Sequence, residues 1–162
     1  MRDQRTFNFR MNELLSIALQ KIKHYCAYQE RCHTEVKNKL YSLGLHKNEV
    51  EQLLAQLIEE NFLNEERFAI AYAGGKFRVK QWGKEKIKYA LRQKQVSNYC
   101  IRKALASINN NDYRKTFISV ANKKLITLRS EKNSFKKREK MKAFLLQKGF
   151  EIEVISEYLK EV

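Results

Sequence analysis

The sequence predicts an all-α protein, built as an elongated array of three tandem three-helix repeats. The chain of 162 residues contains no proline and only five glycines, a composition that disfavours turn-rich β architectures and suits long helices. A pattern of seven positions occurs three times, at a period of about 50 residues, which is typical of a repeat array. Six of the seven positions are apolar in every copy, and their spacing is helical.

The repeated pattern predicts a pair of short helices in each copy. Its third position is Gly44, Gln95 or Gly149, and a glycine there is suited to end the first helix of the pair. Gln95 is expected to cost the middle copy some capping stability. The copies consist of Val36, Leu40, Gly44, Leu45, Val50, Leu54 and Leu57; of Ile87, Leu91, Gln95, Val96, Ile101, Leu105 and Ile108; and of Met141, Leu145, Gly149, Phe150, Ile155, Leu159 and Val162.

A further segment with apolar residues at helical spacing precedes each pair, so each repeat is predicted to be a three-helix bundle. The predicted domains are an N-terminal repeat over residues 1–60, a central basic repeat over 61–109 and a C-terminal repeat over 110–162. Asn64, followed by two glutamates, is expected to cap the long helix of the central repeat. The run Asn109–Asp112 is predicted to be a linker, because Asn and Asp favour turns and caps.

Two smaller features concern the helices themselves. Ser97-Asn98 and Asn48 are expected to cap, or to lie in the first turn of, the second helices of their pairs. Gly74 and Gly75 are adjacent inside the predicted long helix of the central repeat and should soften it. They could form a hinge, although such glycines more often allow another backbone to approach closely.

The overall charge points to a polyanionic partner. The formal net charge is +15, which favours nucleic acid first, and an anionic membrane or an acidic protein second. The three cysteines have no framework spacing and are interpreted as reduced thiols. Because neither a signal peptide nor an apolar run of membrane-spanning length is recognised, we expect a cytoplasmic protein with no membrane contact. We also expect a monomer.

The positive charge is concentrated in two stretches. Residues 76–105 carry ten basic side chains against one acidic, and residues 112–142 carry eleven against three. Lys84, Lys88 and Arg92 recur at i, i+4 spacing and are expected to face away from the apolar stripe of Ile87 and Leu91. Like charges at that spacing repel one another, so a ligand explains them better than folding does. A solvated helix face is the alternative, but such faces usually mix signs. The predicted contact residues are Lys76, Arg78, Lys80, Trp82, Lys84, Lys86, Lys88, Arg92, Lys94, Arg102, Lys103, Lys136, Lys137, Arg138 and Lys140.

Aromatic residues between these cations could stack on bases, although Phe77, Tyr113 and Phe117 fall on apolar stripes and are better explained as core. Trp82, at a predicted turn, is the candidate for exposure, with loop packing as an equal alternative. No catalytic constellation and no phosphate-binding glycine loop is recognised. The spacing of His24, Cys26, Cys32 and His33 fits no common zinc pattern, so we expect no metal site. With no catalytic constellation and no phosphate-binding loop, we also expect neither a cofactor nor enzymatic activity.

The central region resembles the signature of the RecX regulatory proteins. The resemblance includes the run Phe62–Ala69, then Tyr72, Trp82-Gly83 and Lys86-Ile87, and the terminal Phe144-Leu145 with Gly149-Phe150. It implies a modulator that binds along the groove of the RecA filament on single- or double-stranded DNA and restrains ATP hydrolysis and strand exchange. The chain departs from the family pattern at Cys32, Asn64-Glu65, Gln95 and Gly74-Gly75.

Two other functions remain open at this point. A stand-alone nucleic-acid-binding protein would use the same basic face without RecA, and its affinity would fall steeply with rising salt. A small enzyme is the third interpretation, and it would need a pocket with convergent polar groups and acids or bases of shifted pKa.

Overall fold

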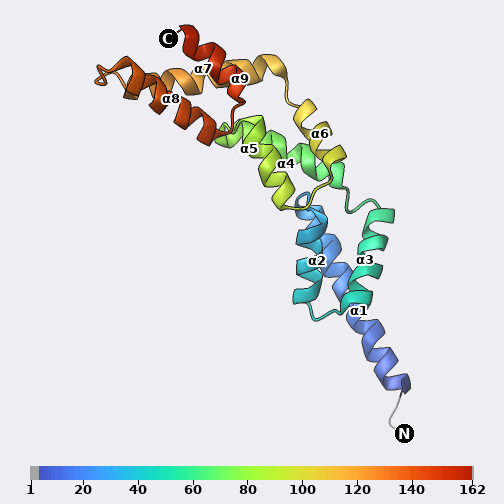
Figure 1. Cartoon of the computed structure of the whole chain (residues 1–162). Coiled ribbons are helices and arrows are strands. Elements are labelled where there is room, and N and C mark those ends of the chain that lie inside the picture. The colour runs from blue at the N-terminus through green and yellow to red at the C-terminus, as the bar shows by residue number, and fades with distance from the viewer. Residues whose placement is uncertain (1–3, 162) are drawn as a thin grey trace. The chain divides into compact units, whose positions relative to one another are not determined.

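The structure is a computed structural model that describes residues 4–161, with side chains from Met11 onward. Within this range the chain forms nine helices and no strand (Figure 1), and the predicted all-α repeat array is confirmed. Residues 1–3 and Val162 lie outside the described residues. The first three belong to the segment in which no signal peptide is recognised, and Val162 is the last position of the repeated pattern. The helices are α1 (Gln4–Tyr28), α2 (His33–Ser42), α3 (Lys47–Glu59), α4 (Glu65–Lys80), α5 (Lys84–Gln93), α6 (Asn98–Ala106), α7 (Asn110–Thr127), α8 (Ser134–Lys148) and α9 (Ile152–Glu161).

The chain divides into two compact units. Unit 1 comprises Met1–Phe68 and Lys94–Val96, and unit 2 comprises Ala69–Gln93 and Ser97–Val162. Unit 1 therefore contains α1, α2 and α3, whereas unit 2 contains α5 to α9 and most of α4. The three predicted repeat domains stay a prediction. Among the described residues, no helix combines the length and the apolar character that crossing a membrane requires.

The repeated pattern forms the buried side of each helix pair. Its first position is at most 1% exposed in all three copies, which confirms the register of the repeat. Gly44 and Gly149 follow α2 and α8 with φ of 88° and 89°, and Gln95 follows α5 with φ of 60°. The predicted helix ends are therefore confirmed. Gln95 adopts a left-handed conformation that glycine would reach at lower cost.

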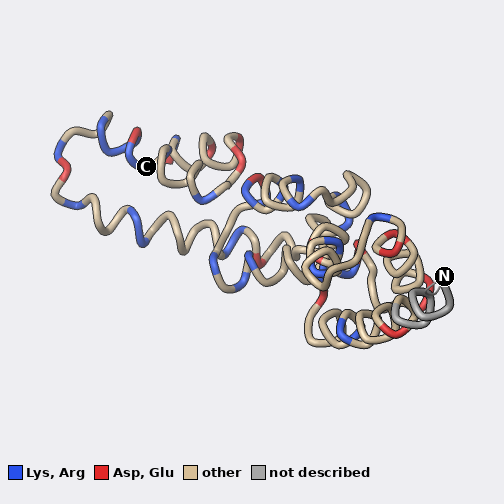
Figure 2. The backbone as a smooth tube through the Cα atoms, turned by 90° about the horizontal axis from the view of Figure 1, so that it is seen from below, with Lys and Arg blue, Asp and Glu red and all other residues tan. Residues whose placement is uncertain are grey.

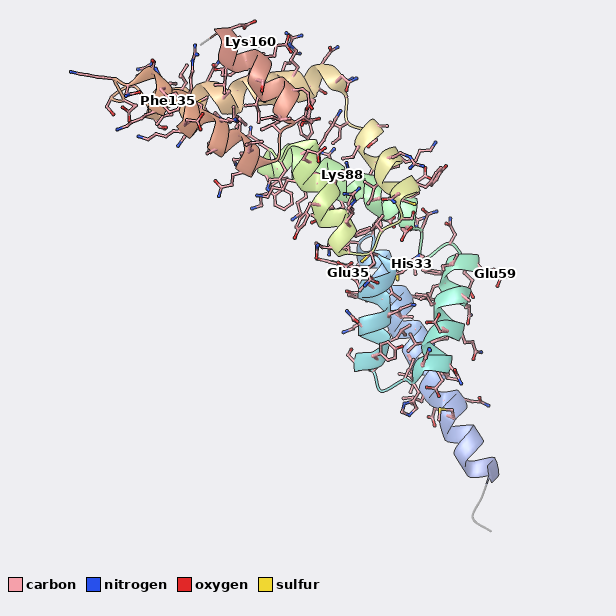
Figure 3. The ribbon with its side chains drawn as sticks, viewed as in Figure 1. His33, Glu35, Glu59, Lys88, Phe135 and Lys160 are labelled. Carbon is pink, nitrogen blue, oxygen red and sulfur yellow. The ribbon has the colours of Figure 1, made fainter. Side chains whose placement is uncertain are left out.

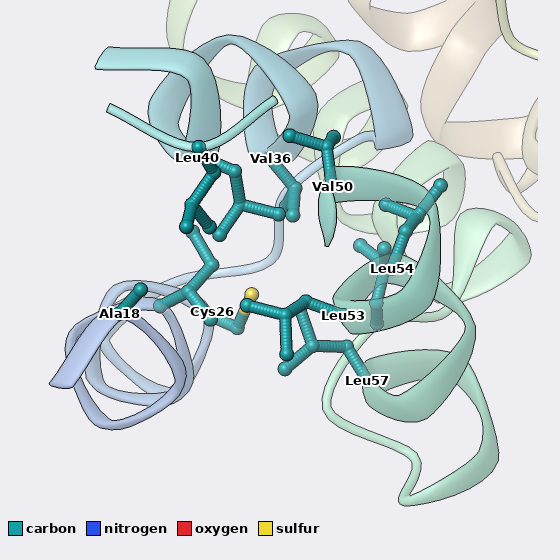
Figure 4. Close-up of a cluster of buried hydrophobic side chains, with 11 residues drawn as sticks. Ala18, Cys26, Val36, Leu40, Val50, Leu53, Leu54 and Leu57 are labelled. Carbon is teal, nitrogen blue, oxygen red and sulfur yellow. The ribbon is translucent and has the colours of Figure 1, made fainter. Parts of the chain in front are cut away.

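The core of unit 1 lies between α1, α2 and α3 (Figure 4). The backbone N–H of Cys32, which precedes α2, donates to the Glu35 carboxylate at 3.3 Å. Glu35 also pairs with the Lys94 ammonium at 2.7 Å, and the Lys94 carbonyl accepts from the Thr34 hydroxyl at 3.2 Å. These contacts hold Lys94 to α2. The buried cluster consists of Ala18, Ile22, Cys26, Val36, Leu40, Leu45, Val50, Leu53, Leu54, Leu57 and Leu63.

The core of unit 2 is aromatic where α4, α7 and the start of α9 meet. The Tyr113 ring lies 5.8 Å from the Phe77 ring and 5.7 Å from the Phe150 ring, centroid to centroid. Phe117 meets Phe150 edge to face at 5.1 Å. All four side chains are buried, so the assignment of Phe77, Tyr113 and Phe117 to the core is confirmed.

Most of the predicted helix starts are confirmed by side-chain caps. The side-chain Oδ1 of Asn64 accepts from the backbone N–H of Arg67 at 2.8 Å, and the Ser97 hydroxyl accepts from the backbone N–H of Cys100 at 3.3 Å. The Asn109 side chain accepts two backbone N–H groups, at 2.9 and 3.1 Å, and α7 begins at the next residue. The prediction that Asn109–Asp112 is a linker was therefore wrong, because the capping tendency of asparagine here starts a helix.

The two adjacent glycines do not interrupt their helix. α4 continues through Gly74 and Gly75. A Cβ at Gly75 would meet nothing within 4 Å, and one at Gly74 would meet only the side chain of Arg78. The expectation that they allow another backbone to approach was wrong, whereas the hinge stays a prediction.

Candidate polyanion-binding surface

Almost all of the excess positive charge belongs to unit 2. Its residues include 22 of the 33 basic side chains and 8 of the 18 acidic ones, which gives +14, whereas unit 1 contributes +1. Figure 2 marks the basic residues in blue and the acidic residues in red along the backbone. Every predicted contact residue except Lys94 belongs to unit 2. A polyanion therefore finds its strongest attraction there.

The turn between α4 and α5 brings two predicted lysines onto the single tryptophan. The Lys76 and Lys86 ammonium groups lie 5.0 and 4.8 Å from the Trp82 ring centroid, within the range of a cation–π contact. The ring is half-buried, and Lys86 also donates to the carbonyl of Gln147 at 3.2 Å. Trp82 thus packs between cations and is less available to a base than a fully exposed ring.

The start of α5 is fixed against the end of α8. The backbone N–H of Gly83 donates to the Lys148 carbonyl at 2.8 Å, and that of Glu85 donates to the Gly149 carbonyl at 2.9 Å. The backbones lie so close that a Cβ at Gly83 would come within 2.1 Å of the Gly149 oxygen. We call this contact the Gly83–Gly149 junction. The junction fixes the end of α8 against the start of α5, so the basic residues of both helices belong to the same compact unit, unit 2.

Tyr113 completes the same contact from α7. Its hydroxyl donates to the Glu151 carboxylate at 2.5 Å and accepts from the backbone N–H of Lys84 at 2.9 Å. Burial, reinforced by the hydrogen bond to Glu151, raises the pKa of Tyr113 far above its ordinary value. The phenol is therefore neutral at physiological pH and serves the structure as a hydrogen-bonding group.

The i, i+4 lysines of α5 are less free than the sequence suggested. The Lys84 ammonium donates to the Asn110 side chain at 3.3 Å and lies 4.7 Å from the Tyr113 ring centroid. Lys88 is half-buried and lies 3.9 Å from Glu85. Only Arg92 is fully turned away from the buried stripe, so the prediction that all three face outward was wrong for the two lysines. Both flank the stripe: α7 contacts Lys84, whereas Lys88 lies near Glu85 of its own helix.

The other predicted residues fall into two groups. Lys94 and Lys140 are held in ion pairs of 2.7 Å, with Glu35 and Glu131, and Lys137 is half-buried. The remaining cations are exposed, and within the described residues their charged groups have no hydrogen bond or ion pair. These are Arg78, Lys80, Arg92, Arg102, Lys103, Lys136 and Arg138.

Sequence reasoning missed three exposed aromatic residues in the same unit. Tyr89 is 65% exposed, Tyr99 is 53% exposed and Phe135 is 72% exposed. The Lys103 ammonium lies 5.6 Å from the Tyr99 ring centroid. Helical phase could have identified Tyr89, because the residue midway between two buried positions four apart, here Ile87 and Leu91, points outward.

A hollow of about 360 Å³ lies between α7 and α9. Tyr113, Phe117 and Tyr158 line it, with Glu157 and Arg114 among its charged residues. Burial raises the pKa of both tyrosines, so neither is an acid–base group near neutral pH. Within the part of the chain that the structure describes, no group of three or more His, Cys, Asp or Glu side chains could hold a metal ion.

Comparison with known proteins identifies relatives of one family. Two family models match, described as "RecX, second three-helix domain" over residues 64–105 and "RecX, third three-helix domain" over residues 111–159. The "Regulatory protein RecX" of Clostridium botulinum (strain Eklund 17B / Type B) is 33% identical over 128 residues, which cover 78% of this chain and 59% of the relative. The chain thus spans about three-fifths of the length of such curated relatives.

Solved structures agree with the fold. The crystal structure of RecX from Lactobacillus salivarius superposes with a TM-score of 0.82 at 25% identity, covering 93% of this chain and 97% of that one. A second crystal structure, of a regulatory protein RecX, gives a TM-score of 0.85 at 20% identity, covering 100% of this chain and 80% of that one. This second likeness concerns the fold alone.

Proposed function

Because the chain belongs to the RecX family of regulatory proteins, we propose that it binds the filament that RecA forms on DNA and regulates this recombinase in DNA repair and recombination. Its main effect is inhibition of ATP hydrolysis and strand exchange, exerted by binding along the filament groove. In this proposal the protein acts as a cytoplasmic monomer and catalyses no reaction itself.

The observation that carries the proposal is the unpaired positive charge of unit 2. Exposed cations without internal partners gain nothing from folding, and their mutual repulsion opposes it. DNA phosphate or an acidic protein surface would relieve that repulsion. The exposed cations lie on several helices of the same unit, so they suit an extended anion better than a single small one.

Inhibition of RecA is the direct test. RecA on single-stranded DNA hydrolyses ATP steadily, and we expect the rate to fall as this protein is added. Unchanged turnover at saturating protein would contradict the proposal. The contacts can then be located with two matched double variants that make the same change in charge.

The first double variant is Arg102→Glu with Lys103→Glu, on α6 of unit 2. Its control is Lys21→Glu with Lys47→Glu, two exposed lysines of unit 1. We expect the α6 variant to need a higher concentration for the same inhibition, whereas the unit 1 variant should behave as the parent. Equal loss in both variants would mean that overall charge, and not the surface of unit 2, determines binding.

A stand-alone DNA-binding protein is the second candidate, favoured by the same charge. Binding of bare DNA would weaken with salt through counterion release, with a slope of roughly −0.9 per phosphate neutralised on duplex DNA. The two functions separate when RecA inhibition and bare-DNA binding are measured on the same variant. Arg92→Glu suits this comparison, because Arg92 is exposed while Lys84 and Lys88 have internal contacts.

A further inference from the structure

Helix α8 has an additional turn at its start. It contains 15 residues, whereas its counterparts α2 and α5 contain 10 each. The first repeated position is the fourth residue of α2 and α5, at Val36 and Ile87, but the eighth residue of α8, at Met141. α8 therefore begins four residues earlier than the repeat requires, which adds about 6 Å of helix at 1.5 Å per residue.

The additional residues, 134–137, contribute little to the core. Ser134, Phe135 and Lys136 are exposed and Lys137 is half-buried. Figure 3 labels Phe135 on α8, close to the connection from α7. The first turn of α8 contains no acidic residue, so its lysines oppose the helix dipole. An exposed phenylalanine and unfavourably placed lysines are features from which folding gains nothing.

The additional turn is nevertheless well held. The Asn133 side chain caps it by accepting from the backbone N–H of Lys136 at 3.0 Å. Glu131 accepts from the backbone N–H of Asn133 at 3.2 Å and pairs with Lys140 at 2.7 Å. The hydrogen bond from Lys140 lowers the pKa of Glu131, so this carboxylate stays ionised and remains paired with Lys140. Phe135 is thus presented from an ordered position.

The charge around Phe135 is strongly positive. Residues 129–142 include seven basic and two acidic side chains, and Glu131 is already paired. Lys132, Lys136 and Arg138 are exposed and have no ion pair within the described residues. An exposed aromatic ring with unpaired cations within three residues on either side in the sequence fits a ligand that offers both a flat ring and negative charge.

We propose that this additional turn binds single-stranded nucleic acid, with Phe135 stacking on an unpaired base while Lys132, Lys136 and Arg138 neutralise the neighbouring phosphates. A single strand provides exposed base faces and regularly spaced phosphates together. In a duplex the bases already stack on one another, and separating a step costs a few kcal/mol. The proposal extends the DNA-facing role proposed above, but it requires no RecA.

The test measures binding of a fluorescent oligothymidylate, and of a duplex of equal length, by anisotropy without RecA. Base stacking on an aromatic side chain contributes about 1–3 kcal/mol, so Phe135→Ala should weaken single-strand binding by roughly 5- to 150-fold. Its salt dependence should not change, because no charge is removed. Phe135→Tyr keeps the ring and should restore the affinity. Leu146→Ala is the matched control, since Leu146 is a 44% exposed apolar residue of the same helix outside the basic segment.

A second variant tests the cations separately. Lys136→Gln with Arg138→Gln should reduce the salt slope for single strands by roughly 1.4, at about 0.7 per contact. Wild-type affinity of Phe135→Ala for the single strand would overturn the proposal, and so would equal weakening of single-strand and duplex binding. If Phe135→Ala lost RecA inhibition but bound oligonucleotides unchanged, the proposal would be overturned as well. The additional turn would then contact a protein rather than nucleic acid. If the stacking fails while RecA inhibition persists, the regulatory function stands without it.

Discussion

Replacement of Gly83 by alanine should open the Gly83–Gly149 junction. The added Cβ would lie 2.1 Å from the Gly149 oxygen, against a minimum near 3.0 Å, so the two backbones must separate by roughly 1 Å. Both junction hydrogen bonds, of 2.8 and 2.9 Å, would then exceed hydrogen-bonding distance. Each of the two donors left unsatisfied costs about 1–3 kcal/mol, so we expect unit 2 to lose about 2–6 kcal/mol of stability.

Urea unfolding followed by tryptophan fluorescence measures this loss. Trp82 is the only tryptophan and adjoins Gly83, so its emission reports on the junction. Gly75→Ala is the matched control, because a Cβ there meets nothing within 4 Å inside α4, and it should stabilise by about 0.5–1 kcal/mol. A wild-type unfolding midpoint for Gly83→Ala would refute the close approach of the two backbones.

Other changes test separate features. Gln95→Gly should raise the free energy of unfolding by about 0.5–1 kcal/mol in urea titrations, since it relieves a left-handed backbone at an exposed side chain. Tyr113→Phe should cost about 1–3 kcal/mol in the same assay, because two hydrogen bonds are lost in a buried site. Burial raises the pKa of the Cys26 and Cys32 thiols, so alkylation of the folded protein should be slower than in urea at pH 8 and should accelerate above about pH 9. Equal alkylation rates with and without urea would contradict that burial. Above about pH 8.5 the unfolded thiols ionise first, so stability should fall as pH rises.

Helical periodicity predicted the fold because the helix pairs bury the same columns in each copy. Val36, Ile87 and Met141 could be aligned from their spacing alone, and all three are buried. The left-handed residue after each first helix was equally predictable, since Gly44 and Gly149 mark it in two copies. Local rules are sufficient for such features, because they act within a turn or two of helix.

The state of individual cations depends on contacts that local rules do not contain. Lys94 pairs with Glu35, 59 residues away in the sequence, and the backbone N–H of Lys84 binds Tyr113, 29 residues away. Nothing in the neighbourhood of either lysine indicates these partners. A charge count could therefore locate the basic part of the chain, but not which cations remain free.

The third position of the repeat shows how one column acquires different roles. At Gly44 a Cβ would meet nothing within 4 Å, so only the positive φ favours glycine there. At Gly149 a Cβ would lie 2.2 Å from the Cβ of Lys86, so the position requires both the positive φ and the missing side chain. Gln95 has the same conformation but an exposed side chain, which explains why glutamine fits the middle copy. The repeat thus fixes the backbone conformation, whereas the junction within unit 2 decides which side chains that conformation tolerates.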